Sequence, residues 1–182
     1  MKMAEGRRSV LMLINWNYYC FGMMIASTCA DKNFVLKTCN NTDIPDLCAQ
    51  ILLSEPRSVN ATDVRGLTDI ALDIAARSAD SASSHASDLS DKYAGLPEQE
   101  PLDICTEGWA EAADDLRDAQ AQVDEANYTA AARIIHEAVD NGDDCEKAFA
   151  DSGLKSVMAD VDKTTSDQLH LAVDLIELLN VP

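Results

Sequence analysis

The sequence predicts an all-α protein, namely an antiparallel up-and-down four-helix bundle preceded by a short N-terminal helical hairpin with two disulfides. Three observations point to this fold class. Apolar residues recur at intervals of three and four along four long segments, which is the period of an amphipathic helix. Short connections join these segments, as in antiparallel bundles. Four cysteines follow the first thirty residues, an even number that suits two cross-links.

The N-terminal segment has the pattern of a signal peptide. A short basic region precedes an apolar stretch over residues 10–25, and small residues up to Ala30 follow it. A membrane anchor is the alternative, but two asparagines interrupt the apolar stretch. We therefore expect residues 1–30 to be cleaved and residues 31–182 to form a secreted domain that is free of the membrane.

The expected mature chain is strongly acidic. Residues 1–30 hold three of the 14 Lys and Arg residues and one of the 32 Asp and Glu residues, so the remainder carries a net charge near −20. Like charge repels nucleic acids and anionic membranes, which excludes both as favoured partners. The charge favours a cationic partner.

The cysteines predict disulfides in an oxidising compartment. Four cysteines allow three pairings. Cys39 and Cys48 lie close together in the sequence, which leaves Cys105 and Cys145 as the natural second bond. A zinc site is the alternative, but the spacing matches no zinc motif and no histidine stands near a cysteine pair.

Three Asn-x-Ser/Thr sequons also fit secretion. Their asparagines are Asn40, Asn60 and Asn127, each at an expected boundary between helices, from which a glycan could project.

The helical hairpin is predicted over residues 31–58. Pro45 suits the first turn of a helix because no intrahelical partner exists there for its missing N–H, and Asp43 before it can cap the helix. Pro56 then ends the helix. The segment 34–39 would pack against this helix, because the first two cysteines tie the two segments together.

The bundle is predicted over residues 62–180, with its first long helix from about Thr62 to Tyr93. The stretch from Gly95 to Pro101 then breaks the helical pattern, because glycine and proline cannot easily continue a helix. The inward positions of this helix are expected at Val64, Leu67, Ala71, Ile74, Ala82, Ala86, Leu89 and Tyr93.

The second long helix is predicted over 102–126, and Asn127 can cap the third. The sequence at 141–144 is expected to interrupt and kink the third helix, Gly153 to close it, and Ser166 to open the last one. The inward positions are expected at Leu102, Cys105, Trp109, Ala112, Leu116, Ala119, Val123 and Ala126, then Tyr128, Ala131, Ile135, Ala138, Cys145 and Phe149, and finally Leu169, Ala172, Val173, Ile176 and Leu179.

No catalytic motif stands out. His85, His136 and His170 lie on separate predicted helices, and the sequence has no phosphate-binding loop or nucleophile elbow. The acidic residues at 140–144 do not match a calcium loop in register. Trp109 falls on an apolar stripe and is expected in the core. We therefore expect no enzyme activity and no cofactor or metal.

The cysteine frame carries a more specific signal. Cys39-x8-Cys48 precedes Pro56-Arg57-Ser58, Asp63-Val64-Arg65-Gly66-Leu67, Cys105-Thr106-Glu107-Gly108-Trp109-Ala110-Glu111-Ala112 and Cys145-Glu146-Lys147-Ala148-Phe149. In this combination the chain resembles the plant invertase and pectin methylesterase inhibitor family, from about Phe34 to Asn180. The resemblance implies a four-helix bundle behind a helical hairpin, with the first cysteine bonded to the second and the third to the fourth.

The resemblance also implies a function. Such proteins are enzyme inhibitors that are located in the apoplast or cell wall, with the vacuole as a second location. They block the active-site cleft of one carbohydrate-active enzyme in a one-to-one complex. We expect pectin methylesterase as the target, because the Pro-Lys-Phe element of some invertase inhibitors is absent at Phe149 and the acidic charge suits a basic enzyme. Acid invertase is the alternative target. A secreted pollen or seed protein without inhibitory activity is another.

An inhibitor of this kind would present an outward face of its long helices, away from the Trp109 stripe. By charge alone, the candidate contact residues are Asp114, Asp115, Asp118 and Asp124.

Overall fold

The computed structural model describes residues 32–180, and in this range the chain contains helices and no strands, which confirms the all-α prediction. Residues 32–39 are helical. The elements after them are α2 (Pro45–Ser54), the 3₁₀ turn η1 (Ser58–Asn60), α3 (Val64–Lys92), α4 (Gln99–Asp124), α5 (Tyr128–Asp151) and α6 (Ala159–Asn180). The predicted signal peptide lies outside the described residues, so its cleavage stays a prediction.

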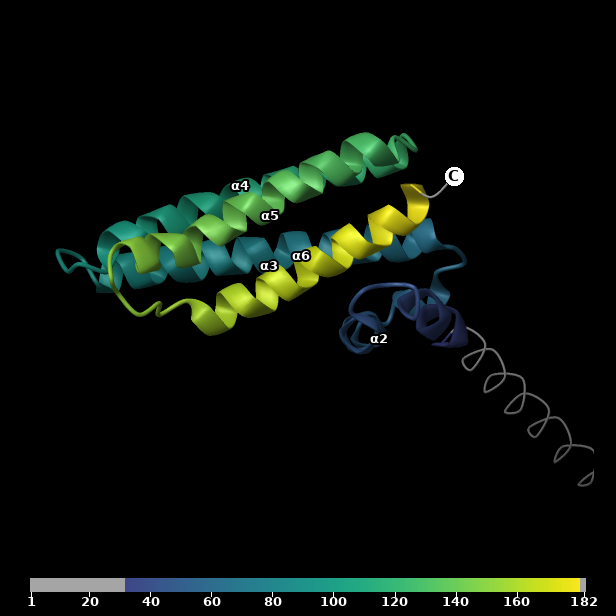
Figure 1. The fold of residues 1–182 in the computed structure, drawn as a ribbon, viewed down its shortest axis with the longest axis horizontal. Helices are drawn as coiled ribbons and strands as arrows, with labels where there is room; N and C mark the ends of the chain where they lie inside the picture. Colours follow the sequence, from purple (N-terminus) through teal and green to yellow (C-terminus); the bar gives the residue numbers. More distant parts are fainter. Residues whose placement is uncertain (1–31, 181–182) are drawn as a thin grey trace, which may run out of the picture.

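The four long helices form the predicted up-and-down bundle (Figure 1). Each packs against the next in sequence, and α6 packs back against α3, so that α3 and α5 are diagonal to each other. Contacts between helix ends show the antiparallel order. Arg65 at the start of α3 bonds to Asp124 at the end of α4, and Asn180 at the end of α6 bonds to the carbonyl of Tyr128 at the start of α5.

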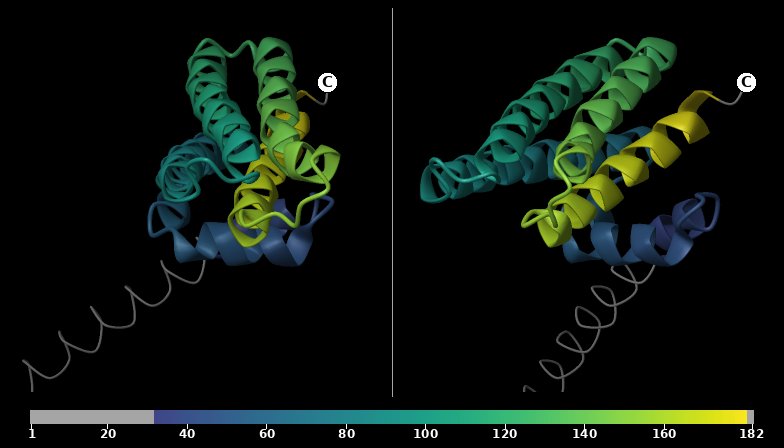
Figure 2. Two further views of the ribbon diagram at one scale, coloured as in Figure 1. Left: turned by 90° about the vertical axis from the view of Figure 1, so that its left-hand side faces the viewer. Right: turned by 60° about the vertical axis from the view of Figure 1, so that its left-hand side comes forward.

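The N-terminal hairpin lies against α3 and α6, across the bundle from α4 and α5 (Figure 2). A disulfide between Cys39 and Cys48, with Cα atoms 5.5 Å apart, joins its two helical segments. The predicted cap of α2 is wrong. Ile44 occupies the N-cap position without a side-chain bond, while the backbone N–H of Asp43 donates to Asp174 of α6 at 3.0 Å. Asp43 therefore fastens the hairpin to the bundle.

The first long helix agrees with its prediction to within two residues at each end. Asp63 caps α3, because its carboxylate accepts a hydrogen bond from the N–H of Gly66 at 2.8 Å. The break that follows is shorter than predicted, since α4 already begins at Gln99 and contains Pro101 in its first turn. Proline is tolerated there because that turn has no intrahelical partner for its N–H.

The core is built largely from small residues. Thirteen alanines are buried along the four long helices, so that the helices approach closely while each contact buries little apolar area. The larger fully buried side chains include Trp109, Phe149, Leu116 and Ile135. Such a core makes the fold more dependent on its two disulfides.

Two predicted features of the last helices are wrong. Helix α5 runs without interruption from Tyr128 to Asp151, because Gly142 faces the ring of Trp109 inside the bundle rather than breaking the helix. Helix α6 begins at Ala159, seven residues before the predicted start at Ser166. Two of the added inward positions are the polar residues Asp162 and Thr165, so the apolar pattern does not reveal this part of the helix.

Candidate functional site

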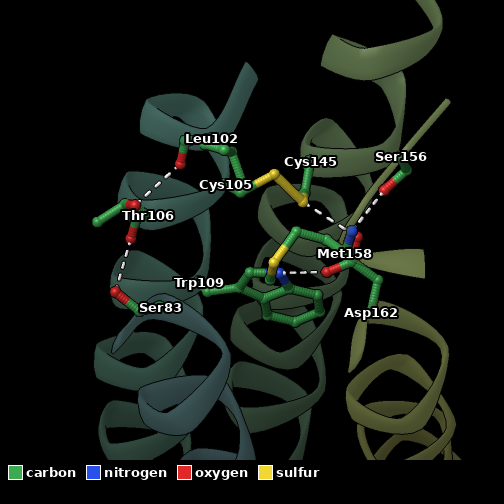
Figure 3. The surroundings of a disulfide bond; sticks show 9 residues. All are labelled: Ser83, Leu102, Cys105, Thr106, Trp109, Cys145, Ser156, Met158 and Asp162. Carbon is green, nitrogen blue, oxygen red and sulfur yellow. Dashed lines mark hydrogen bonds between the residues drawn. A yellow bond between two sulfur atoms is a disulfide. The ribbon is translucent and has the colours of Figure 1, made fainter. Parts of the chain in front are cut away.

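Helices α4 and α5 are held in a fixed register by a disulfide between Cys105 and Cys145, whose Cα atoms are 4.3 Å apart (Figure 3). Two glycines allow this close approach. A β-carbon on Gly108 would lie 2.5 Å from the carbonyl oxygen of Asn141, and one on Gly142 would lie 2.7 Å from the ring of Trp109. The outer face of this helix pair is therefore a rigid surface.

Four carboxylates meet on this face. Glu111, Asp115 and Asp118 of α4 and Glu137 of α5 form a cluster that we term the acidic strip. Asp115 lies at its centre, where partial burial raises the pKa of its carboxyl, the negative charge of Glu137 raises it further, and a hydrogen bond from Asn141 opposes both. Asp118 and Glu111 add smaller effects in the same direction as Glu137.

The acidic strip keeps most of its negative charge unpaired. In the described part of the chain, the nearby ion pairs join Arg117 to Asp80 and Asp114, and Arg133 to Glu137. No lysine or arginine forms an ion pair with the three strip residues of α4 within residues 32–180. A group of unpaired carboxylates on a rigid surface attracts and orients a cationic partner.

The structure divides the four predicted contact residues into two groups. Asp115 and Asp118 belong to the acidic strip. Asp114 instead forms an ion pair with Arg117 of the same helix at 2.8 Å, and Asp124 pairs with Arg65 at the end of the bundle, 3.2 Å away. The ion pairs reduce the charge that the second group offers to a partner.

Glu111 and Glu137 were not among the predicted contact residues. The spacing of Glu111, Asp115 and Asp118 is that of one helix face, which the sequence already displays. Glu137 is different, because its place beside Asp115 depends on the register between two helices. The register follows from the disulfide and the two glycines, which sequence periodicity does not locate.

The three sequon asparagines are all exposed. Asn60 is the last residue of η1, just before α3, and Asn127 lies between α4 and α5, so both are at the end of the bundle where α3 begins and α4 ends. Asn40 lies in the hairpin, next to Cys39. None of the three asparagines belongs to the acidic strip.

The histidines lie apart from one another and are exposed, with His85 on α3, His136 on α5 and His170 on α6. The group in the described residues with the geometry closest to a metal site consists of Cys145, Glu146 and Asp162. Cys145 is disulfide-bonded there and has no thiolate to offer a metal. Within residues 32–180, no helix is both long and apolar enough to cross a membrane.

Comparison with known proteins gives consistent matches. A family model described as plant invertase/pectin methylesterase inhibitor matches residues 33–175. A protein of Actinidia deliciosa named pectinesterase inhibitor is 29% identical over 120 residues, which cover 66% of this chain and 64% of the relative. The match thus spans just under two thirds of the length of that relative.

Two solved structures share the fold. A mutant form of a pectin methylesterase inhibitor from Arabidopsis matches with a TM-score of 0.66 and 19% identity, covering 79% of this chain and 94% of the other. A pectin methylesterase inhibitor from Arabidopsis thaliana matches with a TM-score of 0.60 and 16% identity, covering 82% and 98%. The curated relative and both solved structures are described as inhibitors. With the hairpin, the bundle and the matched region taken together, the chain belongs to the plant invertase/pectin methylesterase inhibitor family.

Proposed function

We propose that this protein is a secreted inhibitor of pectin methylesterase, which it blocks by docking the acidic strip beside the active-site cleft of the enzyme. The single observation that carries the proposal is the family match over residues 33–175. The name of the Actinidia deliciosa relative supports pectin methylesterase as the target. The complex would be one-to-one and would form in the apoplast or cell wall.

The charge of the chain supports this choice of surface. A net charge of −18 over the full chain favours a basic enzyme surface as the partner. The hairpin covers the α3–α6 side of the bundle, which leaves the outer face of α4 and α5 open (Figure 2). A rigid and open acidic face loses little conformational entropy on binding, which favours tight association.

Inhibition of acid invertase is the second candidate, because the matching family model covers invertase inhibitors as well. The vacuole would then be a further location for the protein. The absence of the Pro-Lys-Phe element at Phe149 favours pectin methylesterase over invertase. A family member without inhibitory activity is the third candidate.

The test is to titrate the purified protein against a basic pectin methylesterase and an acid invertase at mildly acidic pH. We expect methylesterase activity to fall linearly to zero at one equivalent of protein and invertase activity to stay constant. Invertase inhibited with methylesterase unaffected would assign the second candidate, and loss of neither activity would assign the third.

A further inference from the structure

A buried carboxyl group lies beneath the disulfide between α4 and α5. Asp162 belongs to the first turn of α6 and is only 3% exposed. Its Oδ1 accepts a hydrogen bond from the indole Nε1 of Trp109 at 2.7 Å, and its Oδ2 lies 3.0 Å from the Sγ of Cys145 (Figure 3). The carboxyl group thus contacts both α4 and α5 from α6.

The contact with the sulfur determines where a proton must be. Cys145 is bonded to Cys105, so its Sγ carries no hydrogen and acts only as a weak acceptor. An ionised Asp162 also has only acceptors, and the 3.0 Å contact would then bring two sets of lone pairs together. The contact becomes a hydrogen bond only when Oδ2 of Asp162 carries a proton and donates it to the sulfur.

The surroundings favour the same protonation state. The residue of α4 that contacts Asp162 is Trp109, which has no charge. The residues of α5 beside Asp162 are Cys145, in the disulfide, and Glu146, whose carboxylate lies within 4.8 Å of the carboxyl group of Asp162. Helix α3 contacts the next turn of α6 through the hydroxyl of Ser78. On α6 itself, Lys163 pairs with the half-buried Asp167. The charged group that acts on Asp162 is therefore Glu146, and its charge is negative.

We propose that Asp162 is a neutral carboxylic acid in the folded protein and serves as a proton-dependent pin that joins the start of α6 to Trp109 and the Cys105–Cys145 disulfide. Loss of the proton removes the bond to Cys145 and leaves a buried negative charge facing Glu146. The start of α6 then loosens from α4 and α5. The pin is independent of which enzyme the protein binds.

The contribution of this pin to the stability of the folded state depends on pH. Burial raises the pKa of Asp162 from its ordinary value of 3.8 to about 8, Glu146 raises it as well, and the Trp109 hydrogen bond opposes them. A group whose pKa is raised on folding stabilises the folded state fully below the unfolded pKa and loses this effect as the pH rises toward the folded pKa. The unfolding equilibrium constant should thus rise by up to about tenfold per pH unit across this range.

Trp109 is a direct reporter of the pin, because its indole N–H contacts Asp162. The chain has two tryptophans, so replacing Trp16 by Phe leaves Trp109 as the sole tryptophan, which can be excited selectively over the tyrosines whether or not the N-terminal segment is retained. We expect the fluorescence of the folded Trp16→Phe protein to titrate with a midpoint well above the ordinary pKa of an aspartic acid, because burial and Glu146 both raise the pKa of Asp162. Adding Asp162→Asn should abolish this titration, since the amide keeps the shape but has no proton to lose in this range.

Two matched variants on the Trp16→Phe background keep the proposal testable if Asp162→Asn does not fold. Glu146→Gln removes the neighbouring negative charge and should move the midpoint to lower pH. Asp160→Asn changes an exposed carboxylate on the same helix and should leave the midpoint in place. A Trp109 signal that stays constant from about pH 5 to about pH 9 in the folded protein would overturn the proposal. A midpoint that Glu146→Gln does not move would also count against it.

Discussion

The ring of Trp109 lies directly against the backbone of Gly142, at a distance that leaves no room for a side chain there. A β-carbon at Gly142 would come within 2.7 Å of Cη2 and 2.8 Å of Cζ3 of the ring. Trp109 is fully buried and its indole nitrogen is fixed by Asp162, so the ring cannot move away easily. Glycine is therefore required at this position in the middle of α5.

We expect Gly142→Ala to destabilise the protein by about 1–3 kcal/mol, the usual cost of overpacking a filled core, although alanine favours helices over glycine. The measurement is thermal or urea unfolding with the disulfides intact. Gly66→Ala in α3 is the matched control, because a β-carbon there meets its neighbours at an ordinary 3.4 Å. A Gly142→Ala protein as stable as the Gly66→Ala protein would contradict this account of the packing.

The Cys105–Cys145 disulfide should make a larger contribution to stability. It closes a loop with a sequence separation of 40, for which chain entropy predicts about 4 kcal/mol. Replacing both cysteines by alanine should lower the urea midpoint accordingly. Replacing Cys39 and Cys48 should cost less, roughly 3 kcal/mol, because that loop is shorter. Equal losses from the two double variants would argue against loop closure as the main source of stability.

The stability of the folded protein at low pH should depend on Glu55. Hydrogen bonds from the side chain and backbone of Arg57 lower the pKa of Glu55 from 4.5 to about 2. A lowered pKa stabilises the folded state above the unfolded value, and this effect is lost as the pH falls toward 2. We expect Glu55→Gln to be less sensitive to acid over this range, measured by melting temperature against pH. Glu125→Gln, at an exposed carboxylate, should behave as the unchanged protein.

The sequons should carry glycans that leave the acidic strip accessible. Protein secreted from a eukaryotic host should lose mass on treatment with an N-glycosidase, and Thr62→Ala and Thr129→Ala should remove the glycans at Asn60 and Asn127. Asn60 and Asn127 both lie at one end of the bundle, so these two variants should have the same affinity for the target enzyme as the fully glycosylated protein. A clear gain in affinity would place the contact surface at that end instead.

Much of the fold can be predicted from the sequence because most inward positions are apolar. The ends of α3, the proline at the start of α2 and the closing glycine after α5 all follow from local rules. The start of α6 does not follow from local rules. Asp162 is buried there, but a charged residue type in the sequence indicates a surface position, so the helical pattern of apolar residues misses this turn. Burying a carboxyl group is costly unless it is protonated or bonded, so sequence rules rarely expect one there.

The candidate site is less predictable for a related reason. Charge and helical spacing place Asp115 and Asp118 on one outward face, but they do not separate these residues from Asp114 and Asp124. The separation depends on two arginines. Arg117 lies one turn after Asp114 on the same helix and is also bound by Asp80 of α3, and Arg65 reaches Asp124 from α3. The two contacts with α3 become visible only once the helices are assembled in register.

The central claim is that the acidic strip is the surface that contacts pectin methylesterase, and charge reversal within the strip tests it most directly. Glu111 and Asp118 are exposed, so replacing both with lysine should preserve the fold. Asp88→Lys/Asp91→Lys is the charge-matched control, since these exposed residues lie on α3, diagonal to α5.

The measurement is the association rate constant with a basic pectin methylesterase at low ionic strength, for the unchanged protein and both double variants. The account predicts that Glu111→Lys/Asp118→Lys slows association by roughly tenfold or more and that the control on α3 has a much smaller effect. Equal slowing by the two variants would mean that only net charge matters and would contradict the assignment of the strip. An unchanged rate in the strip variant would contradict it as well.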